Sequence, residues 1–305
     1  MKKSSDYVCC FGEMLWDLLP TGKLPGGAPM NVALHLKNLG VDVAMISRVG
    51  NDLLGDEIID FVKQKNCATD WIQRDNQQTT GIVEVNITNR TSVTYNIVAP
   101  VAWDFIEVTP SAMEIAAKAY AFVYGTLACR NNHSYETLLI LLEHTTALKI
   151  YDVNLRPPHY TKESIETLLR KADIVKMNED ELAIISGWFD SMALPIDQKA
   201  NLIKTKFGLQ AVIITRGGDG ALLLNETGLH QSNVYKVEVK DTIGSGDSFL
   251  AAMIKNFYLK KPAAYSLNNA CALGAIVAQH HGANPPIKES EILEFMKKGK
   301  SAIGH

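Results

Sequence analysis

Short apolar runs of strand length alternate with helix-like segments through most of this chain. The strand-like runs are rich in β-branched residues and lie at Val8–Phe11, Ala44–Val49, Ala121–Tyr124, Lys149–Val153, Ile174–Met177 and Ala211–Thr215. The segments between them repeat apolar residues about every 3.6 positions, at Met30–Leu39, Asp56–Lys65, Tyr135–Glu143, Ile165–Leu169, Asp180–Ile185 and Asp197–Lys206. Because consecutive parallel strands need a crossover connection, the alternation predicts an α/β fold, a central, mostly parallel sheet with helices on both faces.

One region departs from this alternation and has the pattern of an antiparallel hairpin. Gly81–Thr88 and Ser92–Val98 alternate apolar and polar residues, and Asn89-Arg90 between them suits a tight turn. Met14–Leu19, ahead of Pro20, is expected to add a further strand. We expect these pieces to form a small β lid that projects from the main sheet.

The 305 residues could hold two domains or one large α/β domain. No interdomain linker is recognisable, so we expect a single domain over residues 1–305, with a lid built from about residues 13–26 and 80–100. A bare hairpin is marginally stable, which favours a homodimer formed through the lid. The C-terminal third is expected to be helical, at Asp247–Tyr258, Ala263–Gln279 and Glu289–Lys298.

Charge and composition narrow the classes of partner. The net charge is −3 with no long basic run, so a nucleic-acid partner is not expected. The five cysteines are odd in number and irregularly spaced, which fits a reduced, cytoplasmic setting. The N-terminal apolar run is broken by Glu13 and Asp17, unlike a signal peptide, and no run of about 20 apolar residues predicts a membrane span.

The segment Asp241–Phe249 is the most specific motif. It follows a strand-like run at Val234–Val239 and opens a helix-like run, with Gly244, Ser245 and Gly246 at the mouth of the helix. Such a turn lets several backbone N–H groups face one anion at the positive end of the helix dipole. A carboxylate at this position would repel the anion, so its presence indicates a chemical role. Asp247 is therefore predicted to accept a proton from a hydroxyl that attacks a bound phosphoryl group.

Two further motifs supply candidate ligand contacts near strand ends. Gly26 and Gly27 permit close backbone approach, and Asn31 offers both a donor and an acceptor, although an ordinary helix start remains an alternative. Asp17 is placed to accept hydrogen bonds from hydroxyls, or it is a solvated loop carboxylate. Arg156 suits a phosphate or carboxylate, with a salt bridge to Asp152 as the alternative.

Two more motifs follow later strands. Asn178 and Glu181 are one helical turn apart and could hold water around Mg²⁺, or they could form a helix cap with acidic first-turn residues. Thr215-Arg216-Gly217-Gly218-Asp219-Gly220 could let a flat ligand such as adenine lie on the backbone, or form a tight turn. No Walker sequence is present, and the first strand lacks a dinucleotide fingerprint.

Together these motifs resemble the PfkB, or ribokinase-like, family of sugar kinases. The resemblance covers roughly residues 7–298: Asp241–Phe249 looks like the family's second signature, Gly26–Asn31 like its first, and Asn178–Glu181 fits its Asn-x-x-Glu pattern. Within the family the chain is most similar to fructokinases, on Phe11–Asp17, Gly26–Ala33 and Tyr151–Pro157. Ala28 stands where relatives that act on sugar phosphates usually carry a basic residue, which argues against such substrates.

The resemblance implies a role for each motif. Asp247 would be the base, and the N–H groups of Gly244, Ser245 and Gly246 would stabilise the transferred phosphoryl; serine replaces the commoner alanine at 245, but its backbone N–H is what the role uses. Asp17, Gly26, Gly27, Asn31 and Arg156 would hold the sugar. ATP would be served by Asn178, Thr215, Gly217, Gly220 and Asn269, Mg²⁺ through water by Glu181, and K⁺ by the carbonyls of Asp241 and Ile243.

Rival functions remain open at this point. A ribokinase or nucleoside kinase of the same fold would keep Asp247 and phosphorylate a pentose. A catalytically silent sugar-binding regulator would have no need of that base. A dinucleotide-dependent oxidoreductase is disfavoured by the first strand, which lacks the glycine pattern.

Overall fold

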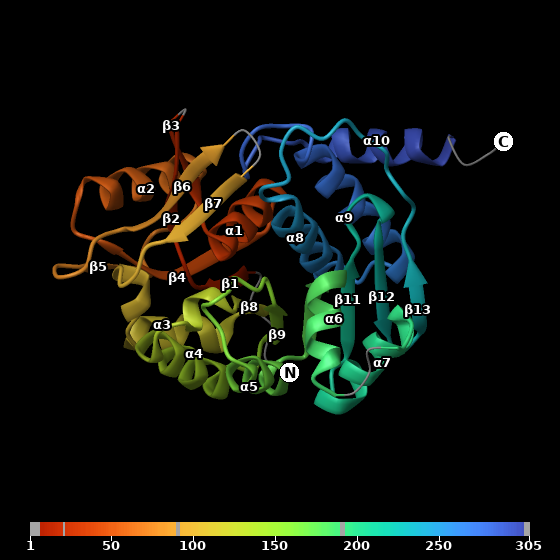
Figure 1. The fold of residues 1–305 in the computed structure, drawn as a ribbon, viewed down its shortest axis with the longest axis horizontal. Coiled ribbons are helices and arrows are strands. Elements are labelled where there is room, and N and C mark those ends of the chain that lie inside the picture. The colour runs from red at the N-terminus through yellow and green to blue at the C-terminus, as the bar shows by residue number, and fades with distance from the viewer. Residues whose placement is uncertain (1–6, 21, 90–91, 190–192, 302–305) are drawn as a thin grey trace.

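The computed structural model describes residues 7–20, 22–89, 92–189 and 193–301. Its centre is a nine-stranded sheet (Figure 1). In spatial order the strands are β13 (Gly228–Gln231), β12 (Ala221–Asn225), β11 (Ala211–Thr215), β10 (Ile174–Asn178), β9 (Leu148–Asp152), β8 (Ala121–Gly125), β1 (Tyr7–Phe11), β4 (Asp42–Gly50) and β5 (Ile72–Asp75). The pairings of β12 with β11 and β13 are antiparallel, and the others are parallel. The predicted α/β fold with a mostly parallel sheet is confirmed.

Helices cover both faces of this sheet (Figure 1). One layer contains α1 (Ala28–Asn38), α2 (Leu53–Gln64), α8 (Ser245–Tyr258), α9 (Ala263–Val277) and α10 (Glu289–Ser301). The other contains α3 (Pro110–Lys118), α4 (Asn132–His144), α5 (Lys162–Lys171), α6 (Glu179–Gly187) and α7 (Ile196–Phe207). Short 3₁₀ turns lie at η1 (Ala102–Phe105), η2 (Leu127–Cys129) and η3 (Gly217–Asp219).

The apolar strand runs are explained by burial on both faces. In β1, Val8 and Cys10 belong to the core under α1 and α8, whereas Cys9 and Phe11 belong to the core under α3 to α7. Alternate side chains of a strand point to opposite faces, so a strand between two helical layers needs apolar residues at every position.

Strand β1 marks the point where the strand order reverses. It pairs with β4 on one side and with β8 on the other, so the chain continues in opposite directions from it. In open α/β sheets such a reversal leaves a crevice beyond the carboxyl ends of the strands, where ligands bind. The predicted motifs follow the ends of β1, β9, β10 and β11.

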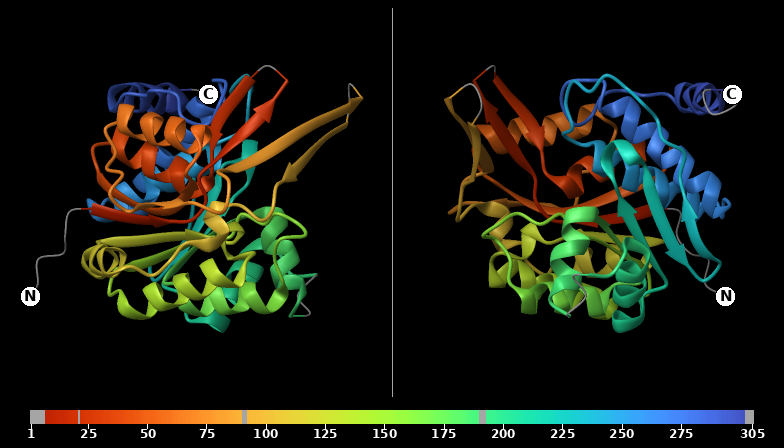
Figure 2. Two further views of the ribbon diagram at one scale, coloured as in Figure 1. Left: turned by 90° about the vertical axis from the view of Figure 1, so that its left-hand side faces the viewer. Right: turned by 45° about the vertical axis from the view of Figure 1, so that its right-hand side comes forward.

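A second sheet of four strands stands beside the main one, in the order β3-β2-β6-β7. Its strands are β2 (Leu15–Leu19), β3 (Gly22–Gly26), β6 (Gly81–Asn89) and β7 (Ser92–Ile97). Figure 2 shows these strands extending out from the body of the molecule. The strands predicted at 14–19, 81–88 and 92–98 lie in this sheet. The turn predicted at Asn89-Arg90 includes Arg90, which lies outside the described residues.

The strand predicted at Val234–Val239 is wrong. This segment follows β13 and has neither strand nor helix structure. Just before it, the Asn233 amide donates to the Asn268 side chain at 2.6 Å, and just after it the Lys240 amide donates to the Ala278 carbonyl at 2.9 Å. The chain therefore crosses over α9 instead of pairing with another strand, and alternation in the sequence cannot reveal that a partner strand is missing.

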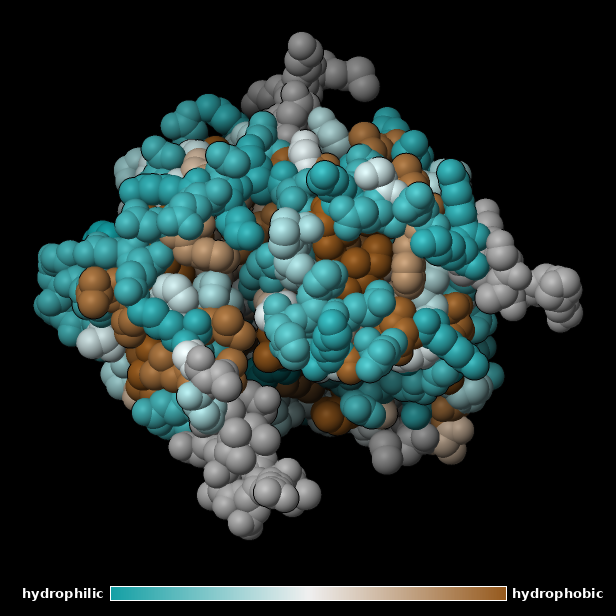
Figure 3. Space-filling model, turned by 90° about the horizontal axis from the view of Figure 1, so that it is seen from above, coloured by the Kyte–Doolittle hydropathy of each residue, from teal (hydrophilic) through white to brown (hydrophobic). Residues whose placement is uncertain are grey.

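The surface over α2 and α10 is mostly hydrophilic. Figure 3, which looks down on this side of the molecule, shows apolar side chains in smaller groups between polar ones. Among the helices of the described residues, none has both the length and the apolar character needed to cross a membrane.

Candidate functional site

The N-terminus of α8 forms the centre of the candidate site. Gly244 precedes the helix with φ of 76°, a conformation that favours glycine, and a Cβ there would lie 2.6 Å from the Ala283 carbonyl oxygen. No side chain caps this helix. The first amides of a helix have no acceptor within it. The Ser245 amide donates to the Thr242 carbonyl in the preceding turn at 3.2 Å, and the Gly246 amide follows it at the positive end of the dipole, where an anion would bind.

Asp247 is held at this position by a chain of two amides. Asn31, in the first turn of α1, donates from Nδ2 to Asp247 Oδ2 at 2.8 Å. Asn284 donates in turn from Nδ2 to Asn31 Oδ1 at 2.7 Å. Asn31 thereby presents its amide correctly, because its oxygen is already engaged. Sequence reasoning missed Asn284, which lies 253 residues from its partner in the chain and carries no local signal.

The pKa of Asp247 is raised by its surroundings. Burial is the main cause, the Asp152 carboxylate adds to it, and the charge of Lys176 and the hydrogen bond from Asn31 oppose it, leaving a pKa of about 6. A carboxylate with this pKa is ionised at neutral pH, yet it is a stronger base than an exposed aspartate. It is therefore suited to take a proton from a hydroxyl group.

The predicted sugar contacts gather around the start of α1. Asp17 on β2 lies beside Gly26 on β3, where a Cβ would come within 2.6 Å of Asp17 Oδ2. Gly27 caps α1 with φ of 112°, and a Cβ there would lie 2.3 Å from the Glu13 carbonyl oxygen. Glycine is thus required at 27 by both conformation and space.

Arg156 faces several carboxylates of the site. The pKa of Asp17 is raised to about 6 by burial, and the charge of Arg156 opposes this rise. Burial also raises the pKa values of Glu13 and Asp247, and the charge of the same guanidinium opposes both rises. Its Nη1 donates to the Leu155 carbonyl at 3.0 Å, so the alternative of a salt bridge to Asp152 is not what the structure contains.

Glu13 is a buried carboxylate that sequence reasoning did not select. Its side chain follows β1 and is 2% exposed. Oε1 accepts the Ala28 amide at 3.2 Å, but Oε2 has no hydrogen-bond partner among the described residues. Burial raises its pKa to about 7, and the charge of Asp247 adds to the rise. A polar residue directly after a fully apolar strand was the available signal.

Lys176 and Asp152 form a buried ion pair that was also missed. They stand opposite each other on β10 and β9, with Lys176 Nζ 2.9 Å from Asp152 Oδ1 and 3.1 Å from Oδ2. Burial opposes the ammonium charge, but Asp152, Asp247 and Glu181 outweigh it and raise the pKa of Lys176. A lysine inside an apolar strand run was the signal in the sequence.

Asn178 and Glu181 form the helix cap that the sequence left as an alternative. The Asn178 side chain accepts the Glu181 amide at 2.8 Å, and Glu181 Oε2 accepts the Asn178 amide at 2.7 Å. Oε1 of Glu181 accepts the Leu155 amide at 2.8 Å. Burial raises the pKa of Glu181. Both carboxylate oxygens of Glu181 thus accept backbone amides, and its role toward Mg²⁺ through water stays a prediction.

Metal ligands are sparse elsewhere. Within the described residues, no three His, Cys, Asp or Glu side chains are grouped so that they could hold a metal ion. The Asp241 carboxylate accepts the amides of Ile243 at 3.0 Å and Gly282 at 3.1 Å, which ties its loop to the segment before Asn284. The K⁺ site predicted at the carbonyls of Asp241 and Ile243 stays a prediction.

The predicted nucleotide residues separate into two places. Thr215 lies opposite Asn178 in the β10–β11 register, next to the α6 cap. Gly217 has φ of 52° and open space where a Cβ would be, whereas a Cβ on Gly220 would lie 2.4 Å from Ser232 Oγ. Gly217–Asp219 form a 3₁₀ turn ahead of β12, close to the tight turn that the sequence left as an alternative, and a contact of this turn with adenine stays a prediction.

Asn269 lies apart from that turn. It is buried in α9, where its oxygen accepts from Asn256 Nδ2 at 2.8 Å and its Nδ2 contacts Met296 Sδ at 3.5 Å. Both polar atoms of its side chain are engaged between helices, so its proposed contact with adenine stays a prediction without support from this geometry.

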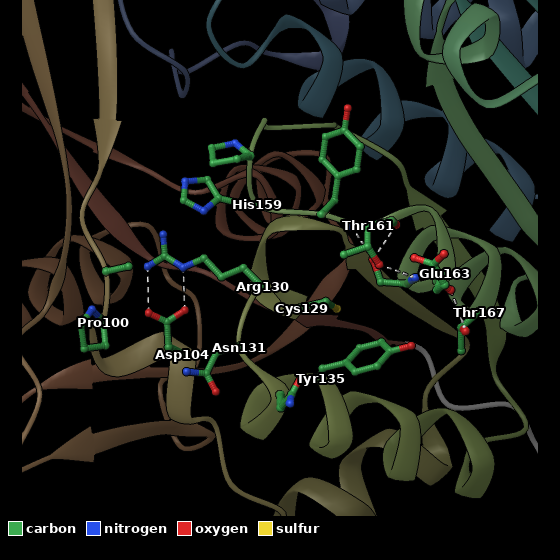
Figure 4. A pocket seen from close by; sticks show the side chains of 15 residues that line it. Pro100, Asp104, Cys129, Arg130, Asn131, Tyr135, His159, Thr161, Glu163 and Thr167 are labelled. Atoms are coloured by element: carbon green, nitrogen blue, oxygen red, sulfur yellow. Dashed lines mark hydrogen bonds and ion pairs between the residues drawn. The ribbon is translucent and has the colours of Figure 1, made fainter. Parts of the chain in front are cut away.

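A cavity of about 640 Å³ has none of the predicted site residues in its lining. Figure 4 shows Arg130 and Asp104 facing each other in its wall. Arg130 donates to both carboxylate oxygens, at 2.7 and 2.8 Å, and its guanidinium lies 3.8 Å from the centre of the Trp103 ring. Because the carboxylate of Asp104 already neutralises the charge of Arg130, we interpret the pair as a structural salt bridge.

The family model of the pfkB family carbohydrate kinases matches residues 6–290. The chain belongs to this family. It is accordingly a carbohydrate kinase, a phosphotransferase with an alcohol group as acceptor. The resemblance predicted from the motifs is confirmed.

Curated relatives and solved structures match along almost the whole chain. Probable fructokinase-6, chloroplastic, of Arabidopsis thaliana is 28% identical over 323 residues, which cover 95% of this chain and 82% of that protein. A crystal structure of fructokinase with bound ATP from Xylella fastidiosa has a TM-score of 0.85 at 22% identity, covering 97% and 99% of the chains. Fructokinase from Vibrio cholerae O395, with fructose, ADP and calcium ion bound, has a TM-score of 0.81 at 22% identity, covering 96% and 100%. At these identities the solved structures show the fold alone.

Proposed function

We propose that this carbohydrate kinase transfers the γ-phosphoryl group of ATP to a hydroxyl of unphosphorylated fructose. The observation that carries the proposal is Asp247, fixed by Asn31 at the N-terminus of α8, where a base and an anion-binding turn meet. Curated relatives named fructokinase, at 26 to 28% identity, support the choice of sugar.

The proposed reaction uses the site in one step. Asp247 accepts the proton of the sugar hydroxyl as its oxygen forms a bond to the γ-phosphorus. The bond from that phosphorus to the bridging oxygen breaks, and ADP leaves with the electron pair. The amides of Gly244, Ser245 and Gly246 stabilise the charge on the transferred group.

The remaining assignments are proposals of the same kind. Asp17, Gly26, Gly27 and Asn31 would hold the sugar hydroxyls, with Arg156 near the phosphoryl. The ATP would lie over Thr215, Gly217 and Gly220. Mg²⁺ would neutralise part of the phosphate charge when bound. Water molecules hydrogen-bonded to Asn178 and Glu181 would be its ligands.

The sheet of β2, β3, β6 and β7 is proposed to close over the sugar as a lid within a single domain, and to pair two copies as a homodimer. Closure would exclude water, which otherwise competes as acceptor. If light scattering gives the mass of a monomer at working concentrations, the proposal of a homodimer is refuted. K⁺ dependence also remains a proposal. A cytoplasmic location is a proposal as well, since one relative is named as chloroplastic.

The first test is ADP production with Mg²⁺–ATP across fructose, ribose, glucose, 2-keto-3-deoxygluconate, adenosine and fructose 6-phosphate. Turnover on fructose above all others supports the proposal. Turnover on ribose or adenosine instead would replace the substrate and keep the mechanism. Sugar binding without turnover would favour a regulator.

The second test is Asp247→Asn. General-base help is worth about 10² to 10⁴-fold, so turnover should fall by at least that range while ATP affinity changes little. Asp197→Asn is the matched control, because Asp197 is an exposed acid in the first turn of α7. Near-normal turnover of Asp247→Asn would refute the assigned base.

A further inference from the structure

Lys176 is a buried cation placed at the edge of the candidate site. Its side chain is 9% exposed, and that of its partner Asp152 is 5% exposed. Desolvating such a pair costs about as much as the attraction returns, so a buried ion pair is weak as a source of stability. A lysine on a central strand, where apolar side chains would pack well, therefore calls for another reason.

The position of the ammonium supplies that reason. A Cβ on Gly246 would lie 3.1 Å from Lys176 Nζ, so the ammonium lies against the first turn of α8, beside the amides that face the ligand. Its charge also acts on Asp247 and on Glu181. The ammonium is therefore close enough for its charge to act both on the proposed proton acceptor and on Glu181, which is proposed to serve the metal end.

The pairing with Asp152 leaves part of the ammonium free to bind. An ammonium group has three N–H donors, and Asp152 can take two of them through Oδ1 and Oδ2. Asp152 also faces Lys176 directly across the β9–β10 register, so it fixes the direction of the side chain. Among the described residues the ammonium makes no hydrogen bond to a third acceptor, so one donor remains for a ligand near Gly246.

We propose that Lys176 is a further catalytic residue, whose ammonium contacts the phosphoryl group in transfer, and that Asp152 is its positioning residue. This rests on the proposed function of the site. Lys176 exchanges no proton: its positive charge stabilises the phosphoryl oxygens and the bridging oxygen that becomes negative as ADP departs. The contact is electrostatic, and a neutral side chain of similar shape cannot replace it.

The decisive comparison is the affinity for ADP against that for AMP-PNP, a non-hydrolysable nucleotide with a γ-phosphoryl group. Both are measured by calorimetry without turnover, for the wild type and for Lys176→Met. Affinity for AMP-PNP should fall about tenfold or more, and affinity for ADP should change less than about threefold. Turnover should fall by about 10² to 10³-fold, with a small change in the KM for sugar.

Lys255→Met is the matched control. Lys255 is likewise a largely buried lysine in an ion pair: it lies in the last turn of α8, its side chain is 11% exposed, and it pairs with Glu289 at 2.8 Å. It should leave the ADP to AMP-PNP affinity ratio and turnover within about threefold of wild type. The double variant Lys176→Met/Asp152→Asn guards against misfolding, because it leaves no unpaired buried charge.

The outcomes separate the inference from the proposed function. An unchanged affinity ratio in folded Lys176→Met, or in the double variant, overturns the inference and leaves the ion pair as a link between β9 and β10. Wild-type protein that binds no AMP-PNP overturns it too. If the wild type binds AMP-PNP more tightly than ADP, and Lys176→Met loses this difference, the contact is supported. If the same wild-type protein phosphorylates no sugar, the proposed function is refuted.

Discussion

Glu13→Gln should stabilise this protein at high pH and leave its stability little changed at low pH. Glu13 is 2% exposed, and Oε2 has no partner within the described residues. Burial raises its pKa from 4.5 to about 7. The native state therefore binds this proton more tightly than the unfolded chain does, and stability is lost as pH rises between those two values. Glutamine keeps the shape and removes the charge.

The magnitude follows from the pKa shift. Each pKa unit is worth about 1.4 kcal/mol, so a shift from 4.5 to about 7 corresponds to about 3 kcal/mol of lost stability at pH 8.5. This is an upper estimate, because the native state can relax around the charge. Asp152 and Asn154 line a small cavity with Glu13 and could accept from the new amide. Any hydrogen bond that glutamine loses or gains there is independent of pH.

The assay is urea unfolding at pH 5.0 and pH 8.5, with the free energy of unfolding compared between wild type and variant. Because about 1 kcal/mol is already lost at pH 5.0, the advantage of Glu13→Gln should grow by about 2.5 kcal/mol between the two pH values, or roughly 4 °C in Tm. Glu294→Gln, at an exposed position on α10, should show no such growth. If the difference between Glu13→Gln and wild type is the same at both pH values, the reasoning fails.

Three further predictions concern other residues of the candidate site. The kcat/KM for the sugar should fall as pH drops below about 6, because Asp247 must be ionised to act as base, and a profile flat to pH 5 would contradict this. Gly27→Ala should destabilise the fold by at least about 2 kcal/mol in urea, since its φ is 112° and a Cβ would meet the Glu13 carbonyl at 2.3 Å. Asn284→Ala should lower kcat about tenfold with modest change in stability, because Asn31 loses the partner that orients it; unchanged kcat would show that Asn31 needs no such help.

The main sheet could be predicted from sequence because its strands are buried on both faces. Runs such as Ile174–Met177 are apolar at nearly every position, and helices with regular spacing separate them. β3 carries two glycines and a proline in five residues, and its strand form depends on pairing with β2. The segment Val234–Val239 failed for the opposite reason: its alternation was strand-like, but no neighbouring strand is there to pair with it.

The residues of the site could be predicted where they lie close together in the sequence, within one motif. Gly244 and Asp247 share one turn, and Gly26, Gly27 and Asn31 share another. What joins the two turns was not predictable, because Asn31 reaches Asp247 across 216 positions of the chain. The importance of Lys176 likewise depends on burial and on a neighbouring strand, and neither is visible in a motif.

The charges of this site make physical sense only when a negatively charged ligand is considered. Burial raises the pKa values of Glu13, Asp17 and Asp247, so the fold buries these carboxylates at a cost in stability. A site that only bound a phosphate would bind it more tightly without these carboxylates, because their negative charges repel the phosphate. Arg156 and Lys176 offset that repulsion, and because Lys176 is pinned within the sheet it can do so without moving when a phosphoryl group enters. Pre-placed charges of this kind favour a transition state over a bound anion, which is the arrangement that phosphoryl transfer requires.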